Sequence, residues 1–423
     1  RRPPRQGCAR TAGEVEVKMT TIRLGEVAKI KHGFAFKSQY FTEEKGSYML
    51  LTPGNFQPRG GYRPHKPKYF AGPIPMEFVL NPSELLLLMT DLSRGIDTLG
   101  SPLLVPSTSD YSLLHNQRIG KITNLSPEVN KTWLYYRLQL ADYHDYIVGT
   151  STGSTVHHTS PSTISEFSFE IPDLKAQKKI AKVLGALDDK INANNRIVDC
   201  TLELQRAHWL KALVGVPSID LSEITSPVLG GTPKRSDEAL WEGTNLWASV
   251  ADMTKASHSH LVDTAEKISD DAIQTRRFSP LPTGAILMSA RGTVGRIVST
   301  TKPTSFNQSA YGFVPPEGYG PALRLALSDV VAELKAKSYG SVFSTITKHQ
   351  INECTVPDVF NPQFDELHTL LNTLESRIIA AELENQALAR TRDELLPLLM
   401  SGRITVGEAE EAADVVGTAA SES

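Results

Sequence analysis

The sequence lacks the features that mark several large classes of protein. Its 423 residues contain only three cysteines, Cys8, Cys200 and Cys354, whose spacing fits neither a disulfide framework nor a metal site. We therefore expect a reducing compartment, the cytoplasm. The longest apolar run covers residues 85–89, whereas roughly 20 apolar residues are needed to cross a bilayer. Residues 1–18 are rich in arginine but hold no apolar signal core, so we expect a disordered leader with Met19 as a candidate start.

The sequence also lacks the motifs of enzymes that act on nucleic acids. Residues 230–234 are glycine-rich but do not have the spacing of a phosphate-binding loop, so a turn is predicted there. Asn361 and Pro362 resemble part of a methyltransferase motif, yet Asn before Pro is also the usual start of a helix. His157 and His158 have no neighbouring Cys or carboxylate that would complete a metal site. We predict no catalytic residue and no metal site, and thus a protein that is not an enzyme.

Two long segments with the same amphipathic pattern organise the chain. Residues 177–215 align with residues 364–402 at one constant offset, without a gap. Apolar residues recur three and four positions apart in both, which predicts two long helices. Because an isolated helix cannot bury such a face, the two are expected to pack as an antiparallel pair. The predicted seam consists of Ile180, Leu184, Leu187, Ile191, Asn194, Leu367, Leu371, Leu374, Ile378 and Asn385.

Local signals predict where these helices begin and end. Asp173 and Asn361 are suitable N-caps for the first and second helix. Gly215 and Gly402, which align with each other, are suitable stops. Pro397 is expected to kink or fray the last turn of the second helix. At 1.5 Å per residue each helix should be roughly 60 Å long.

Charge is distributed unevenly along the chain. The net charge of −3 disfavours binding to nucleic acid, which requires Lys and Arg. However, counting Lys, Arg, Asp and Glu gives a net charge of +3 for residues 173–218 and −5 for residues 358–400. Opposite charges favour pairing of the two helices with each other rather than with copies of themselves.

The segments outside the helices look like two diverged copies of one domain. Short β-rich runs broken by Gly and Pro turns, with one helix near 131–147, predict an α+β domain. The same order returns after residue 218 at offsets that drift along the domain, with a helix expected near 321–337. The predicted organisation is a leader (1–18), a first domain (19–172), the first long helix (173–218), a second domain (219–357), the second long helix (358–402) and an acidic flexible tail (403–423).

Recurring loop residues point to nucleic acid as a ligand. Arg94 and Arg291 occupy equivalent Arg-Gly turns, and arginine can bond guanine edges or phosphates through two N–H groups. The recurring Asn-Gln pairs can bond adenine, or can instead join a loop to a strand. Other polar loop residues suit phosphate contacts, although for at least half of them a solvated surface is the better explanation. The candidate DNA-binding residues are Lys37, Arg94, Asn116, Gln117, Ser154, His157, Lys234, Arg235, Arg291, Asn307, Gln308, Lys348 and His349.

Five segments carry a resemblance to a known family: GFAFKSQYF, TDLSRG, EIPDLKAQKKIAKVLGALDDKI, GGTP and LLPLLMSG. Together they resemble a specificity (S) subunit of a type I restriction-modification system, over about residues 20–405. The resemblance implies an α+β fold in which two similar globular target-recognition domains are separated by two long antiparallel helices that form a coiled-coil spacer. Each domain would recognise one half of a bipartite DNA sequence. The acidity of the second helix and the Arg-rich leader depart from the family pattern.

The resemblance also implies the partners of the chain. These are double-stranded DNA, modification (methyltransferase) subunits that bind S-adenosylmethionine, and restriction subunits that use ATP and Mg. No cofactor is expected on this chain itself, and no membrane. The alternative is a coiled-coil scaffold whose two globular ends bind proteins, with no role in DNA recognition. In the spacer interpretation the helix length sets the gap between half-sites, and Asn194 facing Asn385 would fix the register.

Overall fold

The structure is a computed structural model that describes residues 19–93, 95–274, 279–337 and 345–419, with side chains up to residue 413. The predicted leader therefore lies outside the described residues. Contacts divide the chain into two units: unit 1 holds residues 1–187 and 391–413, and unit 2 holds residues 188–390 and 414–423. Each unit contains one globular domain and a part of each long helix, so the division crosses both helices. Among the described residues, no helix is long and apolar enough to cross a membrane.

The domain of unit 1 is built on two small sheets. The first has the strand order β2-β10-β6-β8, with β2 at Lys29–His32, β10 at Ile119–Thr123, β6 at Leu85–Leu88 and β8 at Pro102–Leu104. The second has the order β3-β5-β4-β9, with β3 at Phe41–Thr42, β5 at Tyr69–Phe70, β4 at Tyr48–Leu50 and β9 at Ser112–Leu114. β4 and β9 are parallel. All four leucines of β6 are buried, because both faces of this central strand are covered.

The domain of unit 2 repeats this topology. Its first sheet has the order β14-β21-β18-β19-β16, with β14 at Val228–Leu229, β21 at Ala310–Phe313, β18 at Ile286–Ser289, β19 at Ile297–Thr300 and β16 at His260–Leu261. Its second sheet has the order β17-β15-β20, with β17 at Glu266–Ile268, β15 at Asn245–Ala248 and β20 at Thr304–Phe306. β15 and β20 are again parallel. The predicted duplication of one α+β domain is thus confirmed by strand order and direction.

The helices inside the domains correspond as well. A short helix, α1 (Leu24–Val27) or α6 (Leu221–Ile224), contacts α4 (Pro161–Ser165) or α10 (Lys348–Asn352), respectively. The expected helix near 321–337 is α9 (Gly320–Lys337). The expected helix near 131–147 is wrong as a single helix, because the chain forms α2 (Lys131–Arg137) and α3 (Ala141–Gly149). The backbone leaves the helical region at Leu140, which precedes α3 with extended dihedral angles.

The remaining short elements complete the two domains. β1 (Thr20–Arg23) pairs with β12 (Ser168–Ile171), and β13 (Ser218–Asp220) pairs with β22 (Thr355–Pro357). In each case the later strand leads into a long helix. The others are β7 (Thr90–Asp91), β11 (His157–His158), α7 (Val250–Lys255), α8 (Asp270–Ile273), and the 3₁₀ turns η1 (Ser38–Tyr40), η2 (Pro53–Asn55), η3 (Met76–Phe78), η4 (Glu238–Trp241) and η5 (Pro362–Phe364).

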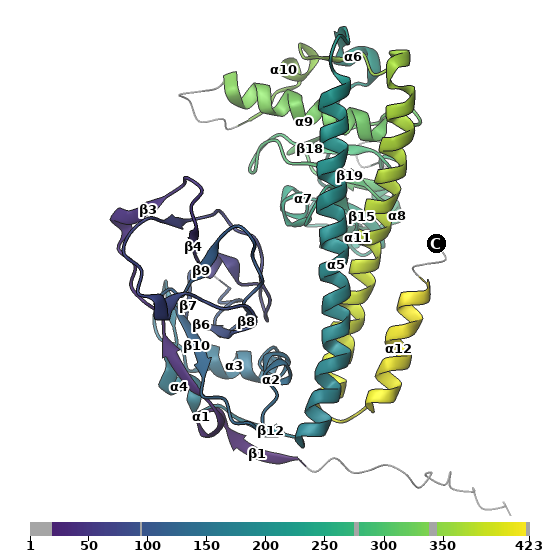
Figure 1. Cartoon of the computed structure of the whole chain (residues 1–423). Helices are drawn as coiled ribbons and strands as arrows, with labels where there is room; N and C mark the ends of the chain where they lie inside the picture. Colours follow the sequence, from purple (N-terminus) through teal and green to yellow (C-terminus); the bar gives the residue numbers. More distant parts are fainter. Residues whose placement is uncertain (1–18, 94, 275–278, 338–344, 420–423) are drawn as a thin grey trace, which may run out of the picture. The chain divides into compact units, whose positions relative to one another are not determined.

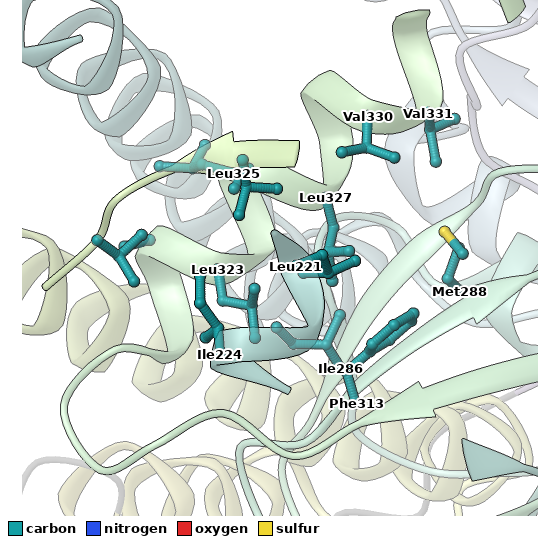
Figure 2. Close-up of a cluster of buried hydrophobic side chains, with 14 of the residues drawn as sticks. Leu221, Ile224, Ile286, Met288, Phe313, Leu323, Leu325, Leu327, Val330 and Val331 are labelled. Carbon is teal, nitrogen blue, oxygen red and sulfur yellow. The ribbon is translucent and has the colours of Figure 1, made fainter. Parts of the chain in front are cut away.

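The core of the second domain shows how a helix covers a sheet. Figure 2 shows Leu323 and Leu327 of α9 above Ile286 and Phe313 of the sheet, with Leu221 of α6 beside them. All five side chains are almost completely buried. Burying a Leu, Ile or Phe side chain stabilises a fold by about 1.5–3 kcal/mol. This cluster also includes residues of the long helices, so the domain and the helices share one core in unit 2.

The two long helices lie within the ranges 173–218 and 358–402 that the sequence assigned to them. α5 spans Leu174–Ala212, and α11 spans Asp365–Met400. Within unit 2 they run side by side (Figure 1), and their antiparallel direction is confirmed by Gln205 contacting Leu371 and by Asn194 contacting Glu384. Val198 of α5 packs on Ile378 of α11.

The predicted caps are present at both helices. Asp173 Oδ1 accepts a hydrogen bond from Ala176 N at 2.8 Å, and Asn361 Oδ1 accepts one from Gln363 N at 3.1 Å, at the turn η5 before α11. Gly215 and Gly402 have φ angles of 80° and 66°, in the left-handed region that glycine adopts easily. The expectation that Pro397 frays the last turn is wrong, since α11 continues through it to Met400.

The predicted flexible tail is also wrong for residues 406–419, which form α12 (Val406–Ala419). Thr405 N and Oγ1 donate hydrogen bonds to Glu408, and Glu408 N donates one to Thr405 Oγ1, which is a capping box. Ala409 is completely buried. The alanine-rich composition, which suggested disorder, also has high helix propensity, and the cap starts the helix.

Candidate nucleic-acid interface

The Asn-Gln pairs lie at equivalent turns in the two domains. Asn116 Oδ1 accepts a hydrogen bond from Arg118 N at 3.2 Å, and Asn307 Oδ1 accepts one from Ser309 N at 3.0 Å. In each domain, a glycine that follows the edge strand of the first sheet lies close to this turn. A Cβ added to Gly33 would lie 2.1 Å from Asn116 O, and one added to Gly230 would lie 2.4 Å from Asn307 O. The two asparagines therefore shape the loop, which is the structural alternative considered for them.

The glutamines that follow are placed differently from the asparagines. Gln117 and Gln308 are both exposed, whereas Asn116 is only 8 % exposed. Gln308 Oε1 accepts a hydrogen bond from the Thr232 hydroxyl. The glutamine side chains rather than the asparagine side chains are thus available to a ligand.

A cavity of about 760 Å³ in unit 1 adjoins the first of these turns. Of the predicted residues it brings together Asn116 and Gln117. Its wall mixes aromatic, cationic and amide groups: Phe36, Phe41, Thr42, Glu43, Leu50, Thr52, Pro53, Gly54, His65, Lys66, Pro67, Lys68, Leu92, Asn116, Gln117 and Arg118. Aromatic faces and cations suit bases and phosphates respectively.

The cations in this cavity differ in their availability. Lys66 forms an ion pair with Glu43, and Lys68 Nζ lies 5.1 Å from the centre of the Phe41 ring. Arg118 is exposed, and no ion pair of its side chain occurs within the described parts of the chain. Sequence reasoning missed Arg118, although its position next to Gln117 was a usable signal. Gln117 and Arg118 are adjacent groups of the types that bond adenine and guanine edges.

In unit 2 the predicted Arg235 is already engaged by the protein. Both of its terminal nitrogens bond the Glu266 carboxylate, and its guanidinium lies 3.8 Å from the centre of the Trp241 ring. The hydrogen bonds from Arg235 hold the pKa of Glu266 below its ordinary value. A planar guanidinium fixed in this way is suited to stacking. Lys234, beside it, is exposed.

The other predicted contact residues are scattered over loops and short elements. Lys37 and Ser154 are exposed, and Arg291 is exposed on a bridge to Thr345. Lys348 and His349 open α10, where His349 forms an exposed ion pair with Glu353 at 3.0 Å. Arg94 lies outside the described residues.

His157 belongs to a structural turn. It is half-buried in β11, which pairs with β7 at Asp91. Asp91 is buried and accepts hydrogen bonds from Ser93 N and Thr98 N, each at 2.7 Å. Burial raises the pKa of Asp91, but these hydrogen bonds outweigh it and lower the pKa overall. Asp91 therefore holds the backbone at Ser93 and at Thr98 through its own carboxylate.

The predicted seam residues are buried or half-buried. Ile191, Leu374 and Asn385 are half-buried, and the others are buried: Ile180, Leu184, Leu187, Asn194, Leu367, Leu371 and Ile378. The hypothesis that Asn194 faces Asn385 is off by one residue in the hydrogen bonds. Asn194 Nδ2 donates to Glu384 at 2.7 Å, and Asn385 Nδ2 donates to Asn195 at 2.9 Å. A carboxylate is the stronger acceptor for a buried amide, and Glu384 also attracts Lys190 at 3.5 Å.

A buried ionic network joins the second domain to the helices. His260 of β16 contacts two carboxylates of α11, Glu375 at 2.9 Å and Glu382 at 2.8 Å. Arg324 of α9 contacts Glu375 at 2.7 Å, and Gln205 of α5 donates to the same carboxylate at 2.9 Å. Burial raises the pKa of Glu375, but the charge of Arg324 and the hydrogen bond from His260 lower it to about 2. The network therefore keeps the Glu375 carboxylate ionised among a guanidinium, a histidine and an amide donor.

No metal site accompanies these groups. Within the described residues, no cluster of three or more His, Cys, Asp or Glu side chains is arranged to hold a metal ion. The cavity beside the first glutamine turn offers hydrogen-bonding, aromatic and cationic groups.

The fold defines a two-domain protein in which one α+β domain occurs twice, each copy followed by a long helix of a pair. A family model for the type I restriction modification DNA specificity domain matches residues 16–199 and 218–362. The chain therefore belongs to this family. The first matched range covers the first domain and the larger part of α5. The second covers the second domain as far as the beginning of the turn η5.

Two curated relatives and one solved structure are similar to the chain. The EcoBI specificity subunit of Escherichia coli is 28 % identical over 166 residues, 39 % of this chain and 31 % of that protein. The MjaIX specificity subunit of Methanocaldococcus jannaschii is 22 % identical over 179 residues, 42 % of this chain and 41 % of that protein. The alignments thus span less than half of each relative. An S subunit from M. genitalium has a TM-score of 0.56 at 18 % identity over 91 % of this chain and 97 % of that one, which supports the fold.

Proposed function

We propose that the chain is the DNA sequence-recognition subunit of a type I restriction-modification complex. Each domain recognises one half of a bipartite sequence, and the helix pair sets the gap between the halves. The observation that carries the proposal is that the same turn, with an exposed glutamine, occurs in both domains. The two domains share one topology, and the chain belongs to the DNA specificity family. Two similar but non-identical domains suit two different half-sites.

Base recognition in the first half-site would come from Gln117 and Arg118. A glutamine amide can bond adenine through N6 and N7, and a guanidinium can bond guanine through O6 and N7. Each such pair contributes about 1–3 kcal/mol of discrimination against the wrong base. In the second domain, Gln308 occupies the position that corresponds to Gln117, and a serine stands in place of Arg118. Lys234 of this domain is also exposed. The two domains therefore offer different chemistry to their half-sites.

The chain itself would perform no catalysis in this complex. Modification subunits would bind S-adenosylmethionine, restriction subunits would use ATP and Mg, and both would dock on the helix pair. The names of the relatives, specificity subunits of type I restriction enzymes, support this division of roles. We place the complex in the cytoplasm, where its DNA substrate would be found.

Mapping methylated bases in DNA from cells that carry the system tests this function. The expected result is a bipartite motif with a fixed gap, which disappears when the gene for this chain is deleted. A methylation pattern that does not depend on the chain would contradict the proposal and favour the protein scaffold instead.

A second experiment tests the spacer. Seven residues inserted after Asn195 in α5 and seven after Glu384 in α11 lengthen the pair by about 10 Å, because each helical residue adds 1.5 Å. At 3.4 Å per base pair the gap in the methylated motif should grow by about three. The same seven residues inserted into the exposed turn after Glu317 serve as the control and should leave the gap unchanged. A constant gap in the helix variant would show that the helices are not the spacer.

A further inference from the structure

Four lysines form a row on the first long helix. Lys175, Lys178, Lys179 and Lys182 are all exposed, and they lie at spacings of three and four residues on one face of α5. Together with Leu174 they line an open depression of about 520 Å³. We call these four side chains the lysine row. The opposite face of the same helical turns is buried, so the lysine row points to solvent. Figure 1 shows where α5 begins and ends.

The charges of the lysine row are not compensated by the protein. In the parts of the chain that the structure describes, none of the four ammonium groups forms an ion pair or a side-chain hydrogen bond. Residues 174–187 contain no aspartate or glutamate. The nearest acidic residue in sequence, Asp173, uses its carboxylate to cap the helix through Ala176 N.

This arrangement opposes the stability of its own helix. Like charges three and four residues apart repel each other, and the row contains Lys175 with Lys179 and Lys178 with Lys182. The row also begins one residue after the helix starts, where the positive end of the helix dipole disfavours cations. Residues that destabilise their own helix are expected where a function requires them.

The second long helix shows that the row is not required for helix pairing. When the gapless alignment of the two helical segments is extended by two residues at its start, the four positions are occupied by Pro362, Asp365, Glu366 and Thr369. The buried positions of the pattern are apolar in both copies, for example Leu184 and Leu371. The pairing face is thus shared, whereas the cationic face belongs to the first helix only.

We propose that the lysine row binds the phosphate backbone of duplex DNA without sequence preference. This inference builds on the proposed function. Lysines on flexible stems suit phosphates as point charges, and the row extends over about 10 Å, which spans about three successive phosphates of one strand. The surface of a protein partner fits less well, because protein interfaces are depleted in lysine and enriched in aromatic residues, and the depression contains no aromatic residue.

The test compares charge removal with charge retention in the assembled complex. One variant changes all four lysines to glutamine and the other changes all four to arginine. Binding to fluorescein-labelled 30-base-pair duplexes, with and without the methylated motif, is measured by anisotropy between 50 and 300 mM NaCl. The slope of log K against log salt falls by about 0.9 for each phosphate contact that is lost.

We expect the glutamine variant to lower this slope by about 2–3 and to bind both duplexes roughly 10- to 100-fold more weakly at 150 mM salt. The ratio between the two duplexes stays constant, since phosphate contacts carry no sequence information. The arginine variant keeps the slope of the unmodified complex.

Other results overturn the inference. If the glutamine variant assembled normally and kept the same slope, the lysine row would be a solvated surface without a ligand. If the glutamine variant lost the modification subunits during gel filtration, the row would be a contact to a protein. These outcomes differ from failure of the proposed function. In that case the unmodified complex would show no preference for the motif duplex.

Discussion

The two domains are attached to the long helices by different chemistry. In unit 1, Gln177 of α5 is 1 % exposed and bonds only main-chain groups: its Oε1 accepts from Asn130 N at 2.8 Å, and its Nε2 donates to Glu128 O and Pro172 O. The aligned position in unit 2 is Phe364, which is completely buried and stacks on Trp209 with ring centres 5.7 Å apart. One position of the repeat thus holds an amide in one copy and an aromatic ring in the other.

The difference extends to charge. Unit 2 adds the network of His260, Arg324, Glu375 and Gln205 to its aromatic contact, whereas Gln177 makes a neutral attachment. Buried ion pairs do not stabilise strongly in total, but removing one member leaves an uncompensated charge. Such pairs also have a defined geometry. The second domain is therefore expected to be more sensitive to single substitutions at its attachment, and more sensitive to pH.

The largest expected effect is the loss of Arg324. Replacing it with methionine leaves the Glu375 carboxylate buried beside fewer partners, and breaking a buried pair in this way costs about 3–5 kcal/mol. Guanidinium unfolding of the purified chain, followed by the fluorescence of Trp209, Trp241 and Trp247 in a Trp133→Phe background, measures the change in unit 2. Lys45→Met, which removes an exposed pair with Asp110, is the control and should leave this transition nearly unchanged. A loss as small as that of the control would contradict a role for the network.

The second prediction concerns pH, to which the two units should respond in opposite directions. Burial lowers the pKa of His260, but its bonds to Glu375 and Glu382 outweigh this and raise the pKa above the ordinary 6.5. Unit 2 therefore has the full stabilisation below about 6.5 and loses it as pH rises through the folded pKa. In unit 1, burial lowers the pKa of His115 to about 4, so stability is present above 6.5 and is lost as pH falls towards 4.

Hydrogen exchange can follow this effect in each unit. After correction for the intrinsic pH dependence, protection of residues 322–331 should fall as pH rises above 6.5, and protection of residues 113–122 should fall as pH drops from 6.5 towards 4. His260→Gln should abolish the first change without affecting the second. Because His258 also faces Glu382 and Asp199, His258→Gln is the matched control for a neighbouring histidine. Parallel responses of the two units would contradict the comparison.

The third prediction is the loss of the neutral attachment. Gln177→Ala leaves the buried N–H of Asn130 and two carbonyl oxygens without this partner, and an unsatisfied buried group costs about 1–3 kcal/mol. Unfolding of unit 1 can be followed by the fluorescence of Trp133, its only tryptophan. Gln57→Ala, at an exposed glutamine of the same domain, is the control. If Gln177→Ala destabilised unit 1 more than Arg324→Met destabilises unit 2, the order proposed for the two attachments would be reversed.

The sequence predicted the repeated parts of the molecule well. The constant offset between the two helical segments predicted α5, α11 and their antiparallel pairing, because apolar periodicity and caps are local properties. The order of the short motifs predicted the second α+β domain. The break between α2 and α3 and the capping box at Thr405 were missed. Both depend on only a few residues, and the T-x-x-E pattern at 405–408 was present in the sequence as a usable signal.

Side-chain partners at the candidate site were harder to predict. Arg235 was expected to be available to DNA, but Glu266, which bonds it, lies 31 residues away in sequence. The asparagines and glutamines of the two turns were treated alike, although burial separates them. Arg118 and the network around His260 were not predicted at all. The partners of Arg235 and the network around His260 depend on contacts between distant segments, which periodicity and spacing do not encode.

The fourth prediction tests whether the two domains recognise different half-sites. Gln117→Ala with Arg118→Ala removes the exposed pair of unit 1, and Gln308→Ala removes the glutamine of unit 2. Each bidentate contact that is removed should abolish about 1–3 kcal/mol of discrimination against the wrong base, at one position of the motif. In cells carrying each variant, methylation mapping should show relaxed bases in one half of the motif only, a different half for each variant. Lys45→Met, away from both turns, should keep the motif. Relaxation of both halves by one variant would contradict independent recognition.

The smallest expected effect concerns the capping box that starts α12. Capping boxes with a glutamate at the third helical position include those of Arg23 with Glu26, Asp220 with Glu223 and Thr405 with Glu408. The first two lie before α1 and α6, and the third lies before α12. Thr405→Ala removes the side-chain acceptor for Glu408 N, which costs about 1 kcal/mol of helix stability. Faster hydrogen exchange limited to residues 406–413 would show this, with Thr405→Ser, which keeps the hydroxyl, as the control. If exchange in this segment were the same in all three proteins, the cap would not be what orders α12.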